Sequence, residues 1–287
     1  MLLPAFFFPS KLQNAAGLRI YTCSMRMSLI FKTARTAARL RFMAGQLLSR
    51  AFALCLGGKV CLCCGRPSAF LPVCGDCVRT RIMAFRPPSQ SRCGVCGRPL
   101  LGEAGVCMTC RREPVFLPVD GVFPLHGYRL WYKNLLFAWK MEGERSLSPV
   151  FAAAVHRALG LLYGGGEVPC LVPVPPRPGK IRATGWDQVD ELCRLLSVLF
   201  GYRVERLLVR LSGEQQKKKS RWERHGMRCV YGPSRRFTQL KRRDIIPQEV
   251  VLIDDLITSG ATVCECADIL KRGFVEKVKV LSLFIVD

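Results

Sequence analysis

Acidic residues are scarce in this chain. Its 287 residues include 44 lysines and arginines but only 21 aspartates and glutamates, which gives a formal net charge of +23. A charge of that sign and size predicts attraction to polyanions such as nucleic acid, an anionic membrane or a phosphorylated substrate. Charge alone does not choose among these partners, and a solvated basic surface without a dedicated partner stays an open alternative.

Long apolar runs are absent as well. A membrane-spanning helix needs roughly 18 or more apolar residues in succession. The apolar stretch 51–64 is interrupted by Lys59, and the stretch 150–163 by His156 and Arg157. We therefore expect a soluble protein with no transmembrane segment. A hydrophobic content of 49% still suffices for a core, and the length predicts one large domain or two modest ones.

A secretory signal is also missing from the start of the chain. Residues 1–60 contain nine lysines and arginines and no acid, but they open MLLPAFFFPS, without a basic n-region. An Arg-rich, acid-free stretch is also typical of organelle transit peptides. Alternatively, translation begins at Met25, Met27 or Met43. We favour this last interpretation, or a disordered basic extension over residues 1–55, and we expect a cytoplasmic protein.

Cysteine, by contrast, is plentiful, and its spacing is regular. Eight of the sixteen cysteines form four CxxC pairs, and two of the pairs are followed by Gly-Arg-Pro. Residues 56–115 therefore look like a duplicated unit in which a loop of nine or ten residues separates two CxxC pairs. Paired CxxC turns supply the four thiolates of a tetrahedral Zn²⁺ site. The predicted ligands of two structural zinc ions are Cys61, Cys64, Cys74, Cys77, Cys93, Cys96, Cys107 and Cys110.

Other interpretations of these cysteines are weaker. A disulfide framework needs an oxidising compartment, and four copies with duplicated spacing favour metal over a redox pair. Pairing successive CxxC motifs is the simplest arrangement, interleaved pairing is the alternative, and Cys63 could compete with Cys64. The ribbons could be purely structural, or they could bind nucleic acid or a partner protein.

The segment VVLIDDLITSGAT, residues 250–262, is the most informative part of the chain. An apolar strand ends in Asp254 and Asp255, and a turn of small residues leads into the helix-like run VCECADILKR. Open α/β sheets place ligands at the carboxyl ends of their strands. Backbone N–H groups at a helix start bind anions. The candidate anion-binding residues are Thr258, Ser259, Gly260, Ala261 and Thr262.

This strand–loop–helix resembles the phosphoribosyl pyrophosphate (PRPP) motif of type I phosphoribosyltransferases. The resemblance implies that Asp254 and Asp255 are the catalytic acids holding the ribose hydroxyls, that the loop holds the 5′-phosphate, and that Mg²⁺ accompanies PRPP. It also implies an α/β domain over residues 120–287, with a mostly parallel sheet flanked by helices and preceded by the Cys-rich zinc-ribbon module. An Asp that serves the base in purine-salvage relatives is replaced here by Thr258, which counts against ordinary purine salvage.

The segments before this motif show an alternation of helices and a strand. After a Pro-punctuated connection over 112–124, an apolar stripe that includes Trp139 predicts a helix ending near Gly143, and further helices are expected over about 147–162 and 186–199. A buried strand is expected over Cys170–Pro175. It leads into a basic loop with Arg177 and Arg182, which would suit pyrophosphate.

A densely charged segment separates these elements from the acidic strand. Residues 212–244 lie where type I phosphoribosyltransferases carry a mobile catalytic loop, so a basic lid over PRPP is one interpretation. Arg221 and Arg224 are its candidate anion contacts, whereas Lys217–Lys219 are as readily explained as a solvated loop.

From about Leu56 to its end, the chain resembles the ComF family of competence proteins, which join a zinc module to a phosphoribosyltransferase-like domain. Family members usually read RGFNQ at 184–188, carry Asn near Met227, and have Ala-Phe at 230–231. The marks of the resemblance are the CxxC pairs, Tyr128, Lys140, Gly143, Val172-Pro-Val-Pro175, Arg182, Gly185-Trp-Asp-Gln188, Gln216, Ser220-Arg221, Arg224 and the Asp-Asp loop.

The ComF resemblance implies a link to the uptake of transforming DNA, with single-stranded DNA and other competence proteins as candidate partners. An enzyme transferring phosphoribosyl from PRPP to an unidentified acceptor is the first hypothesis. The zinc module would then pack over the site and shape the choice of acceptor. The alternative is a nucleic-acid-binding or PRPP-sensing protein that uses the same fold without turnover.

Overall fold

The structure is a computed structural model that describes residue 44 and residues 58–68, 71–86, 91–100, 102–113, 116–211 and 230–286. The expected basic extension over 1–55 falls, except for Ala44, outside these residues. The expected boundaries of the Cys-rich module and of the phosphoribosyltransferase-like domain stay predictions.

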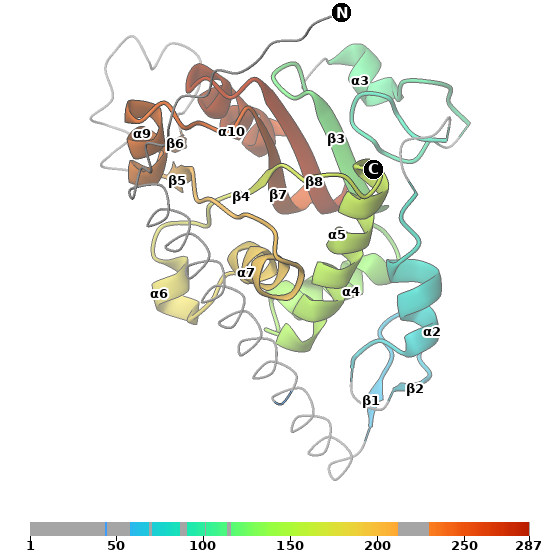
Figure 1. The fold of residues 1–287 in the computed structure, drawn as a ribbon. Coiled ribbons are helices and arrows are strands. Elements are labelled where there is room, and N and C mark those ends of the chain that lie inside the picture. The colour runs from blue at the N-terminus through green and yellow to red at the C-terminus, as the bar shows by residue number, and fades with distance from the viewer. Residues whose placement is uncertain are drawn as a thin grey trace, which may run out of the picture. The chain divides into compact units, whose positions relative to one another are not determined.

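A four-stranded parallel sheet forms the centre of the fold (Figure 1), in the order β3-β8-β7-β4. The register pairs Cys170 with Val250, and Val250 with Val278. The two inner strands are almost entirely buried, as expected for apolar strands covered on both faces. The strands are β3 (Gly121–Gly127), β4 (Cys170–Pro173), β7 (Glu249–Ile257) and β8 (Lys277–Ile285).

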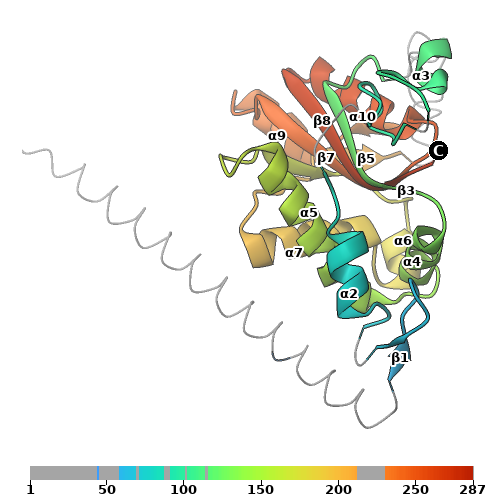
Figure 2. The same cartoon turned by 90° about the vertical axis from the view of Figure 1, so that its right-hand side faces the viewer.

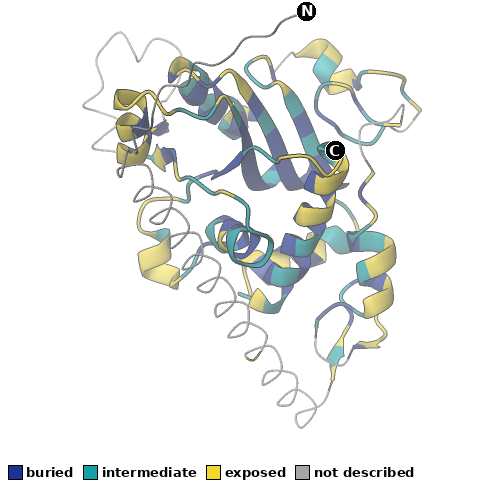
Figure 3. Cartoon of the chain, viewed as in Figure 1, coloured by how far each residue is buried: buried dark blue, intermediate teal, exposed yellow. Residues whose placement is uncertain are grey.

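Helices cover both faces of the sheet (Figures 1 and 2), so the predicted α/β class is confirmed. On one face, α5 (Ser148–Leu162) packs against α7 (Gln188–Phe200), and both contact the strands. On the other face lies α10 (Ala261–Arg272). Figure 3 shows the buried residues concentrated on the strands and on the helix sides that face them.

The helix α4 (Trp131–Lys140) brings the predicted aromatic stripe into the core. Trp139 is fully buried, with its ring edge against Phe151 and its indole N–H donating to Ser148 Oγ at 2.9 Å. The short 3-10 turn η2 (Arg145–Leu147) leads into α5. The prediction that this stripe is core, rather than a platform for stacking bases, is confirmed.

The outer side of β4 is covered by the chain that follows α7. Leu171 N–H donates to Arg203 O at 2.9 Å, and Glu205 N–H donates to Leu171 O at 3.0 Å. This stretch continues into an antiparallel pair that α9 follows, and α10 contacts the second strand of that pair. The elements are β5 (Leu208–Arg210), β6 (Tyr231–Pro233) and α9 (Arg235–Arg242).

The Cys-rich region forms two small ribbons. In the first ribbon, the hairpin β1–β2 is followed by α2 and a π-helical turn, and the second contains one helix. Their elements are β1 (Lys59–Val60), β2 (Pro67–Ser68), α2 (Gly75–Cys77), η1 (Val78–Ile82) and α3 (Met108–Arg112).

The second ribbon covers the outer edge of β3. Arg92 donates to the backbone carbonyls of Gly97 at 2.8 Å, Pro124 at 2.8 Å and Leu125 at 3.1 Å. The connection expected to run to Pro124 is therefore shorter than predicted, because β3 begins at Gly121. Proline is tolerated in an edge strand such as this one, where its missing N–H faces away from the sheet.

Gly97 lies where the second ribbon meets β3, and we expect Gly97→Ala to destabilise the protein at this contact. A Cβ there would lie 2.4 Å from Val122 O and 2.5 Å from Pro124 Cδ, at a φ of +68°. Overpacking of this kind costs about 1–3 kcal/mol, which urea unfolding should detect. Gly102→Ala is the matched control, because its φ is +75° and nothing lies within 4 Å of the added Cβ. Equal losses of unfolding free energy in both variants would show that backbone strain is the cause, and would contradict a clash of the added Cβ with β3.

Candidate functional site

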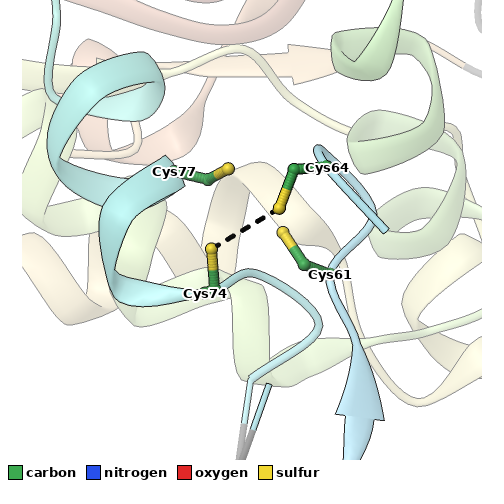
Figure 4. Close-up of side chains that lie close together, drawn as sticks. All are labelled: Cys61, Cys64, Cys74 and Cys77. Atoms are coloured by element: carbon green, nitrogen blue, oxygen red, sulfur yellow. Dashed lines mark hydrogen bonds between the residues drawn. The ribbon is translucent and has the colours of Figure 1, made fainter. Parts of the chain in front are cut away.

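The first candidate site is a group of four cysteines in the first ribbon (Figure 4). The thiols of Cys61, Cys64, Cys74 and Cys77 all lie within 4.8 Å of one another, and the sulfurs of Cys64 and Cys74 are 3.7 Å apart. A tetrahedral Zn²⁺ with Zn–S bonds of about 2.3 Å separates its sulfurs by about 3.8 Å. The group could therefore hold zinc. Cys63 is buried outside the group, so its expected competition with Cys64 is not seen.

The second ribbon repeats this arrangement with Cys93, Cys96, Cys107 and Cys110. The sulfurs of Cys96 and Cys107 are 3.8 Å apart. Successive CxxC pairs thus come together in each ribbon, which confirms sequential pairing over interleaved pairing. All the described cysteines are free thiols, so no disulfide competes with metal within this part of the chain.

Backbone N–H groups prepare one thiol of each ribbon for metal. Burial raises the pKa of Cys61, but N–H groups of Cys74, Cys63 and Cys64 outweigh it and lower the pKa to about 6. Burial likewise raises the pKa of Cys93, and N–H groups led by that of Cys107 lower it to about 7. The thiolate is the form that binds metal.

The second candidate site is the acid pair on β7. Asp254 and Asp255 are both buried, at 8% and 5% exposure. Burial, and then the negative charge of Asp255, raise the pKa of Asp254 well above its ordinary value. Asp255 has its own counter-charge, since Lys140 Nζ donates to its Oδ2 at 2.7 Å. Carboxylates that share a buried site ionise unequally, as two like charges cannot be held close together cheaply.

The loop after the acids leads into α10 as predicted. Thr258 and Ser259 are exposed, and Gly260 adopts a φ of +85° immediately before the helix. Among the described residues, no side chain bonds the N–H groups of the first turn except Ser259 Oγ, which accepts from Ala261 N at a long 3.4 Å. The first turn of α10 is therefore open to an anion.

The basic loop after β4 lines a cavity of about 780 Å³. Arg177 and Arg182, both predicted, are exposed and form no ion pair within the described part of the chain. Arg206 and Arg210 join them from the β5 side. Neither acid of the pair nor the loop 258–262 belongs to this lining. The cavity is therefore a basic compartment beside the acid pair's strand and does not enclose the acids.

Sequence reasoning assigned no role to Arg206, Arg210 or Gln188. The Gln188 amide donates to Asp255 Oδ2 at 2.7 Å and comes from the start of α7, 67 residues away in the chain. The ComF resemblance marks Lys140 and Gln188, but only the fold shows that both contact the same carboxylate oxygen.

The predicted basic segment lies largely outside the described residues, including Arg221 and Arg224. Its flanking residues are described: Leu211 N–H donates to Val230 O at 2.8 Å. Glu265 on α10 accepts from the N–H groups of Val230 at 2.6 Å and Tyr231 at 2.9 Å. Both flanks are thereby fixed to the helix that carries the candidate phosphate loop.

The first ribbon contacts the loop between α4 and α5. Lys59 pairs with Glu144 in that loop, and Tyr132 Oη on α4 donates to Arg81 O at 3.0 Å. Arg145, in the same loop, pairs with Glu191 on α7. The loop directly follows Lys140, the last residue of α4, which bonds Asp255. The first ribbon therefore contacts both α4, whose end bonds Asp255, and the loop that follows it.

Comparison with known proteins supports the ComF resemblance. No protein-family model matches the chain. Competence protein ComFC of Bacillus subtilis (strain 168) is 25% identical over 228 residues, which are 79% of this chain and 75% of the relative. Competence protein ComFC of Streptococcus pneumoniae (strain ATCC BAA-255 / R6) is 25% identical over 214 residues, 74% of this chain and 86% of the relative. With the two four-cysteine groups, these similarities confirm the resemblance predicted from the motifs.

Among the residues that the structure describes, no helix combines the length and the apolar character needed to cross a bilayer.

Proposed function

We propose that this protein binds PRPP with Mg²⁺ and acts in natural competence, in the manner of the ComFC proteins it resembles. The observation that carries the proposal is the placement of three features toward the carboxyl ends of two neighbouring parallel strands, β4 and β7. These are the acid pair on β7, the open first turn of α10, and the Arg-lined cavity after β4. Such sheet edges bind phosphorylated ligands.

Each feature suits one part of PRPP. Asp254 and Asp255 would accept hydrogen bonds from the ribose hydroxyls, residues 258–262 would surround the 5′-phosphate, and Arg177 and Arg182 would meet the pyrophosphate. Arg206 is less available, because it pairs with Asp190 at 2.6 Å. Departure of pyrophosphate to an acceptor nucleophile would make the protein a phosphoribosyltransferase.

Magnesium fits the same site through its chemistry. Mg²⁺ prefers oxygen ligands and keeps several waters, so it needs few protein carboxylates. Within the described residues, Asp255 Oδ1 and Asp254 Oδ2 accept no hydrogen bond. When bound, the metal would neutralise charge on the pyrophosphate, while the protein's own acids and arginines orient the two ends of the ligand.

The test is calorimetric titration of PRPP with Mg²⁺ into the full chain. We expect the wild type to bind and an Asp254→Asn/Asp255→Asn variant to lose at least about 100-fold in affinity, since charge-assisted hydrogen bonds contribute about 1.5–3 kcal/mol each. Asp268→Asn is the control, because the carboxylate of Asp268 lies on the solvent side of α10 and pairs with Arg272. Absence of heat from a folded, zinc-loaded wild type would refute PRPP binding.

The basic charge supports a second candidate, binding of single-stranded DNA without turnover. The net charge of +23 predicts salt-sensitive, mostly sequence-independent contacts to phosphates. We expect the affinity for a DNA oligonucleotide to fall between about 10³- and 10⁵-fold from 50 to 200 mM salt if 6–10 phosphates are contacted. A flat salt dependence would argue against this candidate.

A further inference from the structure

Two side chains from different helices donate hydrogen bonds to the same carboxylate oxygen of Asp255. Its Oδ2 accepts from Lys140 Nζ and from Gln188 Nε2, each at 2.7 Å. Lys140 is the last residue of α4, and Gln188 is the first residue of α7. Two donors on Oδ2 fix the rotation of the carboxylate. Among the described residues they leave Oδ1 without a donor.

The amide of Gln188 extends this contact toward the basic loop. Lys180, at the start of α6 (Lys180–Thr184), donates both to Gln188 Oε1 and to Asp187 Oδ2, the latter at 2.7 Å. Asp187 Oδ1 in turn accepts from the N–H groups of Val189 and Asp190, each at 3.0 Å, and so caps α7. One partly buried network therefore connects the cavity's basic loop to Asp255.

Gln188 can satisfy this network in only one orientation. Its NH₂ group faces a carboxylate and its oxygen faces an ammonium group, and turning the amide would place oxygen against oxygen and N–H against N–H. The side chain is 3% exposed, so water cannot readily replace either partner. Gln188 therefore connects Lys180 of α6 to Asp255 through two hydrogen bonds of fixed direction.

Lys140 supplies the positive charge that this arrangement needs. Asp254 and Asp255 lie side by side in a buried strand, and Asp254 meets the negative charge of its neighbour. Apart from Lys140, the donors to Asp255 and Asp254 from the described part of the chain are a neutral amide and a backbone N–H. Lys180 is farther away, with Gln188 between it and Asp255.

We propose that Lys140 and Gln188 are positioning residues of the PRPP site, which fix the orientation of the Asp255 carboxylate through its Oδ2 and present its Oδ1 to the ligand. The inference rests on the proposed function and adds to it two residues with defined roles. Gln188 further couples the ribose acid to the basic loop, so occupation of the pyrophosphate side by an anion should favour the orientation of Asp255 that binds ribose.

The first test is the pH profile of PRPP–Mg²⁺ affinity in Lys140→Met. Burial raises the pKa of Asp254, and the charge of Lys140 acts to lower it. Loss of that charge makes protonation of Asp254 easier, so the fall of affinity on acidification should begin at higher pH than in the wild type. We expect at least a tenfold loss at neutral pH, with recovery in Lys140→Arg. Lys277→Met is the control, because it removes the same charge from an exposed position at the start of β8.

The second test is Gln188→Glu, which conserves shape but places a second carboxyl group against Asp255. As in Lys140→Met, we expect the affinity to begin falling at a higher pH on acidification than in the wild type. The melting temperature should be unchanged at low pH, where the new carboxyl group is neutral. If Lys140→Met melts below the assay temperature, Gln188→Glu and Lys140→Arg still test the positioning role.

The outcomes separate the two proposals. A folded wild type that does not bind PRPP overturns the proposed function. A wild type that binds, together with folded Lys140→Met and Gln188→Glu variants of unchanged affinity and pH profile, overturns the positioning role alone.

Discussion

We expect Cys107→Ser to release one of two zinc ions and to destabilise the sheet, not only the ribbon. Cys93, Cys96 and Cys107 pack in the same hydrophobic cluster as Val122 of β3 and Val280 of β8. Binding of structural zinc is worth about 10–16 kcal/mol in small zinc domains, whereas whole domains are stable by about 5–15 kcal/mol. Loss of this ion should therefore open the β3 edge of the sheet.

The measurement pairs zinc content, by elemental analysis of the purified protein, with thermal unfolding. Cys64→Ser should also release one ion but should lower the melting temperature less, because the first ribbon's cysteines are not part of that cluster. Cys63→Ser is the matched control: its thiol is buried next to the ligands but outside the four-thiol group. Zinc loss from Cys63→Ser, or full zinc content in Cys107→Ser, would contradict the assigned ligand sets.

The ribbons and the acidic loop could be predicted because their chemistry is local in sequence. A CxxC pair brings two thiols together within one turn, and a strand followed by Gly260 sets the start of α10 by itself. Buried helices such as α4 and α5 could also be predicted, since apolar spacing reports which side of a helix is buried.

The rest depended on contacts between distant segments. Lys140 and Asp255 are 115 residues apart, so no local sequence pattern predicts their ion pair. The edge strand β3 was not predicted, because Pro124 is a poor strand former, and the ribbon residue Arg92 compensates by donating to its outer carbonyls. Such pairings follow from the topology of the sheet and not from the composition of either segment.

Asp254→Asn should stabilise the fold while weakening the binding of PRPP, because the native acid is buried for function at a cost in stability. Burial and the charge of Asp255 raise its pKa well above 3.8. Asparagine keeps the acceptor for the N–H of Asp255, now bound at 2.8 Å, and removes the charge. Stabilising substitutions commonly gain about 0.5–2 kcal/mol, or about 2–4 °C per kcal/mol in a domain of 150–250 residues.

The sign of the pH dependence distinguishes this cause from improved packing. As pH rises from 3.8, the unfolded chain releases the proton of Asp254 before the folded protein does, so the wild type loses stability up to the raised folded pKa. The advantage of Asp254→Asn should therefore be small near pH 4 and grow toward neutrality. Asp255→Asn is the contrasting variant, since it removes the partner of Lys140 and should show no such gain. A difference in melting temperature that is constant from pH 4 to pH 8 would rule out the buried charge as the cause.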